Sequence, residues 1–225
     1  MTGVSAAALA KRYPVLYHMA WDGSWPSILQ HGLLSTSTLL DRLGMLGAAR
    51  QEIESLHRPD SVPVRNGAMS VVFRDQKPMG DSGLQRCLQG GLKPADWYRM
   101  LNQFVFFWVT QERLMKLLDA RAYRGQSSVV ITLETSRLLA KHQADVVLSP
   151  INSGCTKPFP HPRGPDTFQP LHQYPFDALV KKRGRSGEPV VELAVRGGVP
   201  NVSDIAELVQ EYKLLKPVKT LWRRP

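Results

Sequence analysis

The chain lacks the sequence features of disulfide-rich, zinc-binding, membrane-spanning and secreted proteins. It contains only two cysteines in 225 residues, Cys87 and Cys155, without a Cys-x-x-Cys spacing. Neither a disulfide framework nor a compact zinc motif is therefore indicated. No apolar run approaches the roughly 20 residues of a membrane helix, and the first 12 residues lack the basic start of a secretory signal. We therefore expect an intracellular, cytoplasmic protein with no membrane partner.

Several catalytic motifs are also missing. The sequence has no Gly-rich dinucleotide loop, no Gly-Lys-Ser or Gly-Lys-Thr, and no Gly-x-Ser-x-Gly elbow. Acidic residues do not cluster at metal-ligand spacing, so no metal cofactor is expected. These absences leave few enzyme classes.

Acidic residues are scarce beside basic ones, with 19 Asp and Glu against 29 Lys and Arg and a formal net charge of +10. Such a surface favours polyanions, nucleic acid first. Solvated loops and a frayed tail are the alternative explanation. The excess lies in two clusters: Lys181, Lys182, Arg183 and Arg185, and then Lys213, Lys216, Lys219, Arg223 and Arg224.

Strand-like and helix-like segments alternate at irregular spacing, which predicts a single α+β domain over residues 1–225 rather than regular βαβ units. Strands are predicted over 13–19, 70–74, 104–109, 128–133, 145–148 and 189–195. Helices are predicted over 24–31, 37–56, 94–101, 111–122, 136–142 and 202–208. The remaining predictions are a loop over 58–66, a long loop insertion over 149–188, and an edge strand or helix over 212–221.

Two distant segments carry the strongest functional signal. His18 lies in a short apolar strand, followed by a helix that ends at Gly32 and by the hydroxyl-rich turn Ser35-Thr36-Ser37. Near the other end, Glu192 is the only acid in its strand, Pro189-Val190-Val191-Glu192-Leu193-Ala194-Val195. A carboxylate in a buried strand is costly unless something uses it.

These segments resemble DarT-type DNA ADP-ribosyltransferases and, more distantly, the RNA 2′-phosphotransferases that share their fold. The opening block is Tyr17-His18-Met19 with His31-Gly32-Leu33, and the closing block is Val190 to Val195 with Val199-Pro200 and Ile205. Between them, Val72-Phe73-Arg74-Asp75-Gln76-Lys77-Pro78-Met79 is similar to a strand ending in an arginine before Pro-Met. The chain also resembles an uncharacterised bacterial family in the blocks Asp96 to Arg99, Val105 to Trp108 and Ser149 to Gly154.

The resemblance implies an α+β fold with a split, mostly antiparallel sheet and flanking helices. It also implies transfer of ADP-ribose from NAD, used as a substrate, to an acceptor, in a toxin or defence protein that an antitoxin or immunity protein would restrain. Glu192 and Arg74 would be catalytic, with Arg74 or Lys77 holding the diphosphate. The residues that would contact NAD are His18, the backbone of Met19, Ser35, Thr36, Ser37, Arg74 and Phe107.

The acceptor is expected to be DNA or RNA. The strand of Glu192 lacks the Glu-x-Glu or Gln-x-Glu pair of arginine-modifying toxins, which argues against protein arginine. The residues expected to bind nucleic acid are Lys77, Arg121, Arg124, Asn152, Lys181, Lys182 and Arg183. Two other functions stay open: NAD-dependent removal of an RNA 2′-phosphate, and nucleic-acid binding without catalysis.

Each of these residues also has an ordinary structural explanation. His18 could be a satisfied core histidine, Glu192 could face solvent on an edge strand, and Arg74 could pair with an acid. Phe107 could belong to the core, and Asn152 could simply make a turn. Arg121 and Arg124 flank Tyr123, a pattern that suits either a nucleic-acid surface or a helix C-terminus.

Overall fold

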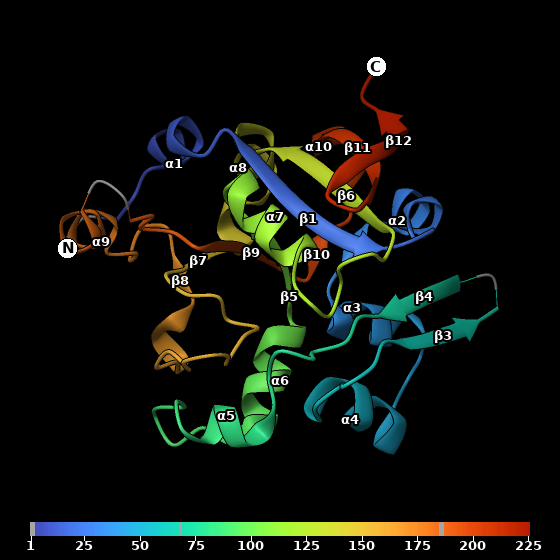
Figure 1. The fold of residues 1–225 in the computed structure, drawn as a ribbon, viewed down its shortest axis with the longest axis horizontal. Coiled ribbons are helices and arrows are strands. Elements are labelled where there is room, and N and C mark those ends of the chain that lie inside the picture. Colours follow the sequence, from blue (N-terminus) through green and yellow to red (C-terminus); the bar gives the residue numbers. More distant parts are fainter. Residues whose placement is uncertain (1–2, 68, 185–186) are drawn as a thin grey trace.

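The computed structural model of the chain describes residues 3–67, 69–184 and 187–225. Its centre is an eight-stranded sheet with the strand order β12-β11-β6-β1-β5-β9-β7-β8, in which every neighbouring pair is antiparallel. The strands are β1 (Val15–Trp21), β5 (Phe104–Trp108), β6 (Ser128–Glu134), β7 (Val146–Ser149), β8 (Gln169–Pro170), β9 (Glu192–Arg196), β11 (Ala206–Lys213) and β12 (Lys216–Arg223). Helices flank this sheet (Figure 1), so the predicted α+β class is confirmed.

Two small ribbons stand outside the large sheet. β3 (Val62–Asn66) and β4 (Met69–Phe73) form a hairpin that projects to one side of it (Figure 1). β2 (Leu33–Leu34) pairs with β10 (Gly198–Val199), which joins the two distant sequence segments directly. Gly32 has φ +88°, and a Cβ there would lie 2.5 Å from the Cα of Pro200. Glycine is therefore required where the end of one segment meets the other.

Ten α-helices occur in the described residues. They are α1 (Ala6–Arg12), α2 (Trp25–His31), α3 (Thr36–Arg42), α4 (Gly47–Ser55), α5 (Asp81–Gln85), α6 (Pro94–Asn102), α7 (Gln111–Leu118), α8 (Thr135–His142), α9 (Phe176–Arg183) and α10 (Val202–Ile205), with short 3-10 turns at Gln143–Asp145 and Pro165–Thr167. α7 packs over β1 and β5, and α8 packs against α1 and β6. None of the helices in the described ranges is long and apolar enough to cross a membrane.

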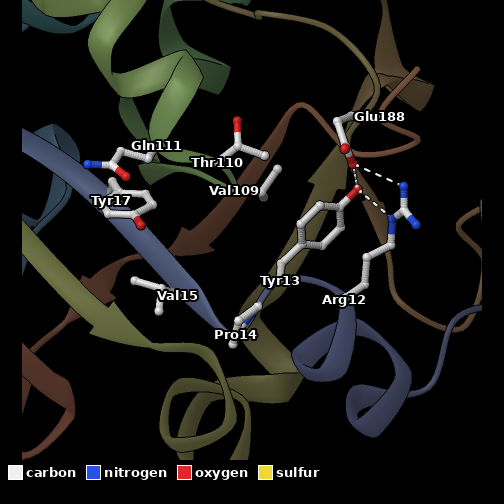
Figure 2. A pocket seen from close by; sticks show the side chains of 9 residues that line it. All are labelled: Arg12, Tyr13, Pro14, Val15, Tyr17, Val109, Thr110, Gln111 and Glu188. Atoms are coloured by element: carbon white, nitrogen blue, oxygen red, sulfur yellow. Dashed lines mark hydrogen bonds and ion pairs between the residues drawn. The ribbon is translucent and has the colours of Figure 1, made fainter. Parts of the chain in front are cut away.

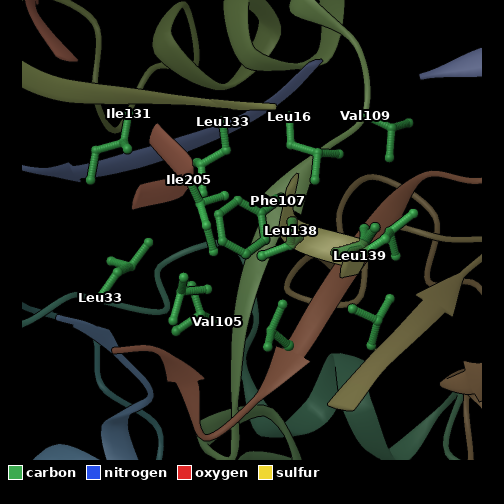
Figure 3. Close-up of a cluster of buried hydrophobic side chains, with 14 of the residues drawn as sticks. Leu16, Leu33, Val105, Phe107, Val109, Ile131, Leu133, Leu138, Leu139 and Ile205 are labelled. Atoms are coloured by element: carbon green, nitrogen blue, oxygen red, sulfur yellow. The ribbon is translucent and has the colours of Figure 1, made fainter. Parts of the chain in front are cut away.

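Strand alternation gives the sheet two apolar faces. On one face, Leu16, Phe107, Ile131 and Leu193 join side chains of α8 and α10 in the main buried cluster, part of which Figure 3 shows. On the other face, Met19 and Val130 pack with residues of α7, among them Leu114 and Leu118. Burial of both faces holds the central strands in one register.

The sheet is split between β1 and β5. β1 pairs with β6 along its whole length, from Val15 opposite Glu134 to Trp21 opposite Ser128. By contrast, β1 and β5 share the single register pair Tyr17 and Trp108. The two halves of the sheet therefore meet at a narrow junction and separate beyond it.

Several predicted elements are wrong in detail. The single helix predicted over 37–56 is two helices, because Gly44 and Gly47 adopt φ of +63° and +60° and break it. Leu46, which continues the helical spacing of Leu39 and Leu43 in the sequence, is 77% exposed in this break. The loop predicted over 58–66 contains β3, and the helix predicted over 202–208 ends at Ile205, where β11 follows. The segment 149–188, predicted to be a loop, contains β8 and α9, while residues 185–186 lie outside the described residues.

Candidate active site

A cavity of about 910 Å³ lies where the two halves of the sheet separate. Its walls come from β1, α2, α3, β4, β5, α7 and the segment 152–155. Leu33, Phe73, Met79 and Tyr123 all line it, and each belongs to a different buried cluster, so the cavity occupies the junction of the apolar layers. Its volume lies in the upper part of the range for small-molecule sites.

Glu192 is the first residue of β9 and lines this cavity while only 4% exposed. It lies opposite Trp108 of β5 and Ser149 of β7, so it stands in the middle of the sheet and not on a solvent-exposed edge strand. The backbone N–H of Ser153 donates to its Oε2 at 3.0 Å. Burial raises the pKa of Glu192 to about 7, against the opposing effects of the Ser153 hydrogen bonds and of the nearby Arg163 and Arg113 charges. Near neutral pH this carboxyl exists in both protonation states.

His18 lines the same cavity from β1. Its Nδ1 lies 2.9 Å from the carbonyl oxygen of Phe106, which can only accept, so Nδ1 carries the proton. Burial lowers the pKa of His18 to about 4, and the charge of Arg74 lowers it further, while the Phe106 hydrogen bond acts in the opposite direction. The imidazole is therefore neutral at physiological pH, and its Nε2 is an acceptor.

His18 and Glu192 start from opposite faces of the sheet. Glu192, Trp108 and Tyr17 are register partners in turn, so their side chains share a face, and His18 alternates to the other. The ring of His18 accordingly packs 5.7 Å from that of Phe107, on the main-core face. Both side chains reach one cavity because the sheet is open at this point.

Arg74 follows β4 and also lines the cavity. Its Nη1 donates to the carbonyl oxygen of Met19 at 2.9 Å, and its guanidinium lies 4.9 Å from the ring centre of Tyr123. Its buried Nε has no hydrogen-bond partner among the described residues. Burial lowers the pKa of Arg74 below its usual range. Arg74 is thus a cation with spare hydrogen-bonding capacity, and it forms no ion pair with Asp75 or Glu134 within the described ranges.

Met19 has one backbone group already engaged. Its carbonyl oxygen accepts from Arg74, so this atom points away from β6 and toward the split. In an extended strand the N–H of a residue points to the same side as its C=O. The N–H of Met19 is therefore directed toward the cavity, whereas its C=O is held by Arg74.

The three hydroxyl residues of the turn at 35–37 differ in whether they line the cavity. Thr36 lines the cavity. Ser35 is buried, and its hydroxyl caps α3 by accepting from the N–H of Thr38, while the hydroxyl of Ser37 donates to Glu54. The sequence predicted all three as ligands of NAD, yet Ser35 and Ser37 do not line the cavity, because local hydrogen bonds turn them away from it.

Two further predicted residues lie at the cavity. Phe107 lines it but is 1% exposed and belongs to the main core, so it supports His18 more than it offers a stacking surface. Asn152 lines the cavity beside Ser153, at the start of the loop that holds Glu192.

The sequence of the whole chain was compared with protein families and with curated proteins. A family model described as "Family of unknown function (DUF7002)" matches residues 14–206. The chain belongs to this family. A search of curated proteins found no match.

All cavity-lining residues of this DUF7002 chain, from His18 to Glu192, fall within the matched span. The three sequence blocks that suggested an uncharacterised family converge on Glu192. Trp108 and Ser149 are its strand partners, and Trp97 Nε1 donates to the carbonyl of Ser153 at 3.3 Å. The basic cluster that begins at Lys213 lies beyond the matched span.

The residues predicted to bind nucleic acid are, apart from Asn152, outside the cavity. Lys77 does not line it and pairs with Asp60 at 3.7 Å, so of the two residues expected to hold the diphosphate only Arg74 lines the cavity. Arg124 pairs with Asp119, and Arg121 is exposed. Tyr123 between them is buried, with its hydroxyl donating to Asp75, so it does not provide an exposed aromatic surface for a nucleic-acid base.

The first basic cluster lies on α9, at the far end of the molecule from the β3–β4 hairpin (Figure 1). Lys181 and Lys182 are exposed. Arg183 instead donates to the carbonyl oxygens of Glu188 and Pro150, so it fastens the loop to the helix. Arg185 of the predicted cluster lies outside the described residues.

Three residues of this site were not predicted from the sequence. Arg58 lines the cavity and is buried, with donors to the carbonyl oxygens of Ile53 and Arg74 and to Asn102, and burial lowers its pKa to about 10. Arg113 lines the cavity from α7. Ser153 holds Glu192, and no local pattern marks a main-chain donor in an irregular loop.

A second hollow, of about 330 Å³, lies at the other end of β1 (Figure 2). Three of its polar side chains bond one another, since the hydroxyl of Tyr13 donates to Glu188 while Arg12 donates to both. In the described ranges, no group of three or more His, Cys, Asp or Glu could hold a metal ion, and both cysteines are free.

Proposed function

We propose that this protein is an ADP-ribosyltransferase that transfers ADP-ribose from NAD to a nucleic-acid acceptor. The observation that carries the proposal is that His18 and Glu192, 174 positions apart in the sequence, line one cavity at the split of the sheet. The resemblance to DarT-type enzymes supplies the reaction class, and the chemistry of the cavity residues is compatible with it.

The reaction breaks the bond between C1′ of the ribose and the nicotinamide nitrogen. Nicotinamide leaves with the electron pair, positive charge develops on the ribose, and an acceptor atom then bonds to C1′ and loses its proton. A carboxylate beside the ribose stabilises the cation and can take that proton. Glu192 suits this role because its pKa of about 7 lies near the operating pH of a general base.

His18 would orient the ribose. Its neutral Nε2 can accept a hydrogen bond from a ribose hydroxyl, and the Nδ1–H bond to Phe106 fixes the ring. The N–H of Met19 is directed to the same cavity and would bind the carboxamide oxygen of nicotinamide. Binding both ends of the nicotinamide riboside would align the bond that breaks.

Arg74 would hold the diphosphate. A guanidinium matches phosphate oxygens with paired donors, and the unsatisfied Nε of Arg74 would gain a partner from an anionic ligand. Arg113 lines the cavity on the side of Glu192 and is suited to a phosphate of the acceptor strand. The net charge of +10 favours such an acceptor.

The test is transfer of label from NAD. The purified protein is incubated with NAD labelled in the adenylate part and with separate DNA, RNA and protein pools, alongside Glu192→Gln. We expect label in a nucleic-acid pool and free nicotinamide, both reduced about 10²- to 10⁴-fold by the substitution. Glu188→Gln, at the second hollow, is the matched control and should retain activity.

The rival functions predict other results. Label in no pool, no nicotinamide release, and nucleic-acid binding that survives Glu192→Gln would replace the proposal with a non-catalytic binding domain. Release of nicotinamide only with a 2′-phosphorylated RNA would identify the 2′-phosphotransferase reaction.

A further inference from the structure

The loop that holds Glu192 is itself held by a buried cation. Arg163 is 1% exposed, yet none of its donors reaches a carboxylate in the described residues. Its Nε donates to the carbonyl oxygen of His161 at 3.1 Å, Nη1 to that of Ser153 at 2.7 Å, and Nη2 to that of Cys155 at 2.8 Å. One planar guanidinium therefore ties three points of the segment 153–161 together.

Ser153 connects this guanidinium to Glu192. Its carbonyl oxygen accepts from both Arg163 Nη1 and Trp97 Nε1, while its N–H donates to Glu192 Oε2 at 3.0 Å. The guanidinium also lies 5.7 Å from the ring centre of Trp97. Ser153 is thus held by two donors on one side and holds the carboxyl on the other.

Stability alone does not account for a buried arginine here. Desolvation of the guanidinium is expensive, and carbonyl oxygens compensate it only in part. Burial lowers the pKa of Arg163, which shows the same cost. An apolar side chain would fill the space beside Trp97 at lower cost, but it could not bond three main-chain oxygens in a fixed fork.

We propose that Arg163 is a positioning residue that fixes the Ser153 N–H so that the carboxyl of Glu192 faces the cavity. The effect of Arg163 on catalysis rests on the function proposed above, whereas its effect on the placement of Glu192 does not. Arg163 acts through Ser153 and needs no contact with NAD.

The charge of Arg163 adds a second effect. It lowers the pKa of Glu192, in the same direction as the Ser153 hydrogen bonds and against burial. Loss of the Arg163 fork should therefore raise the pKa of Glu192, because the hydrogen bond that favours the carboxylate is weakened.

The test uses Arg163→Lys, which keeps the charge and loses the fork. The pKa of Glu192 is measured by carboxyl ¹³C NMR, with the signal assigned by its absence in Glu192→Gln, and the hydrogen exchange of the Ser153 amide is measured in parallel. We expect a higher Glu192 pKa and faster Ser153 exchange. The matched control is Arg183→Lys, since Arg183 also bonds main-chain oxygens, including that of Pro150, without touching Ser153. It should change neither value.

An unchanged Glu192 pKa and unchanged Ser153 exchange in folded Arg163→Lys would overturn the proposal. If that variant does not fold, Arg163→Gln, which also loses the fork, takes its place; because it removes the charge as well, the hydrogen exchange of the Ser153 amide is then the deciding measurement. Neither NMR readout requires enzymatic activity, so this proposal and the transferase proposal fail separately. Where activity is found, we expect kcat to fall about 10- to 100-fold in Arg163→Lys while KM for NAD changes little.

Discussion

Each of the two cavity walls buries a titratable group, and burial shifts the two pKa values in opposite directions. On the β1 wall, burial keeps His18 neutral by lowering its pKa to about 4. On the β9 wall, burial raises the pKa of Glu192 to about 7. His18 is fixed by one bond to Phe106, whereas Glu192 is fixed through Ser153, Arg163 and Trp97. Of these two groups, it is Glu192 on the β9 wall whose pKa lies near neutral pH, and it is also the one held by the larger set of contacts.

The largest effect on ligand binding is expected at Arg74. Arg74→Ala should weaken NAD binding about 100-fold, because it removes a charge-assisted contact to phosphate. Lys77→Ala should change it less than about 2-fold, since Lys77 lies outside the cavity and its ion pair with Asp60 is exposed. Calorimetric titration with NAD measures both, and equal losses would show that Arg74 has no special role.

The next effect is the pH dependence of stability at Glu192. Between about pH 4.5 and 7 the unfolded state loses this proton while the folded state keeps it, so the wild-type free energy of unfolding falls as pH rises through that range. Glu192→Gln removes this loss. Its stability relative to wild type should therefore rise from pH 4.5 to 7 and stay constant outside this window. Urea titrations across pH measure the difference, and a flat difference would mean that the carboxyl is not buried as described.

The β1 wall should show the opposite trend. Between about pH 6.5 and 4 the unfolded state gains a proton on His18 while the folded state does not, so wild-type stability falls as pH decreases. His18→Gln should gain stability relative to wild type over this range. The same urea titrations test it, and a gain on raising the pH instead would contradict the neutral imidazole.

The parts of this site that could be predicted from sequence are those marked by a pattern among neighbouring residues. β1, β5 and β6 are short apolar runs, and their positions were predicted within a few residues. The hydrophobic spacing across Gly44 and Gly47 suggested one helix, because left-handed glycines interrupt a helix without changing its apolar pattern. His18, Arg74 and Glu192 stood out as chemically unusual in apolar strands.

The supporting residues could not be predicted in the same way. Ser35 and Thr36 are neighbours in one turn, and only the capped start of α3 decides which one faces the cavity. Ser153 acts through its main chain, and Arg163 acts on main-chain oxygens in an irregular loop. Neither role depends on a spacing that the sequence displays. The sequence left open whether Tyr123 and the arginines beside it form a nucleic-acid surface, and the bond of Tyr123 to Asp75 and its contact with Arg74, which bury it, are not marked by any local pattern.

The smallest effect is expected far from both walls. Lys181 and Lys182 are exposed on α9 and do not line the cavity. The double substitution Lys181→Ala/Lys182→Ala should leave nicotinamide release unchanged and reduce nucleic-acid affinity by less than about 10-fold, with a smaller salt dependence. Filter binding at several salt concentrations measures this. A loss of NAD turnover would contradict the separation between α9 and the cavity.

The most direct test of the central claim is a crystal structure of Glu192→Gln with NAD, since this variant should bind the dinucleotide without consuming it. We expect the nicotinamide riboside between His18 Nε2 and residue 192, with the diphosphate at Arg74. An empty cavity at saturating NAD, or NAD bound elsewhere such as the hollow between Tyr13 and Gln111, would contradict the account.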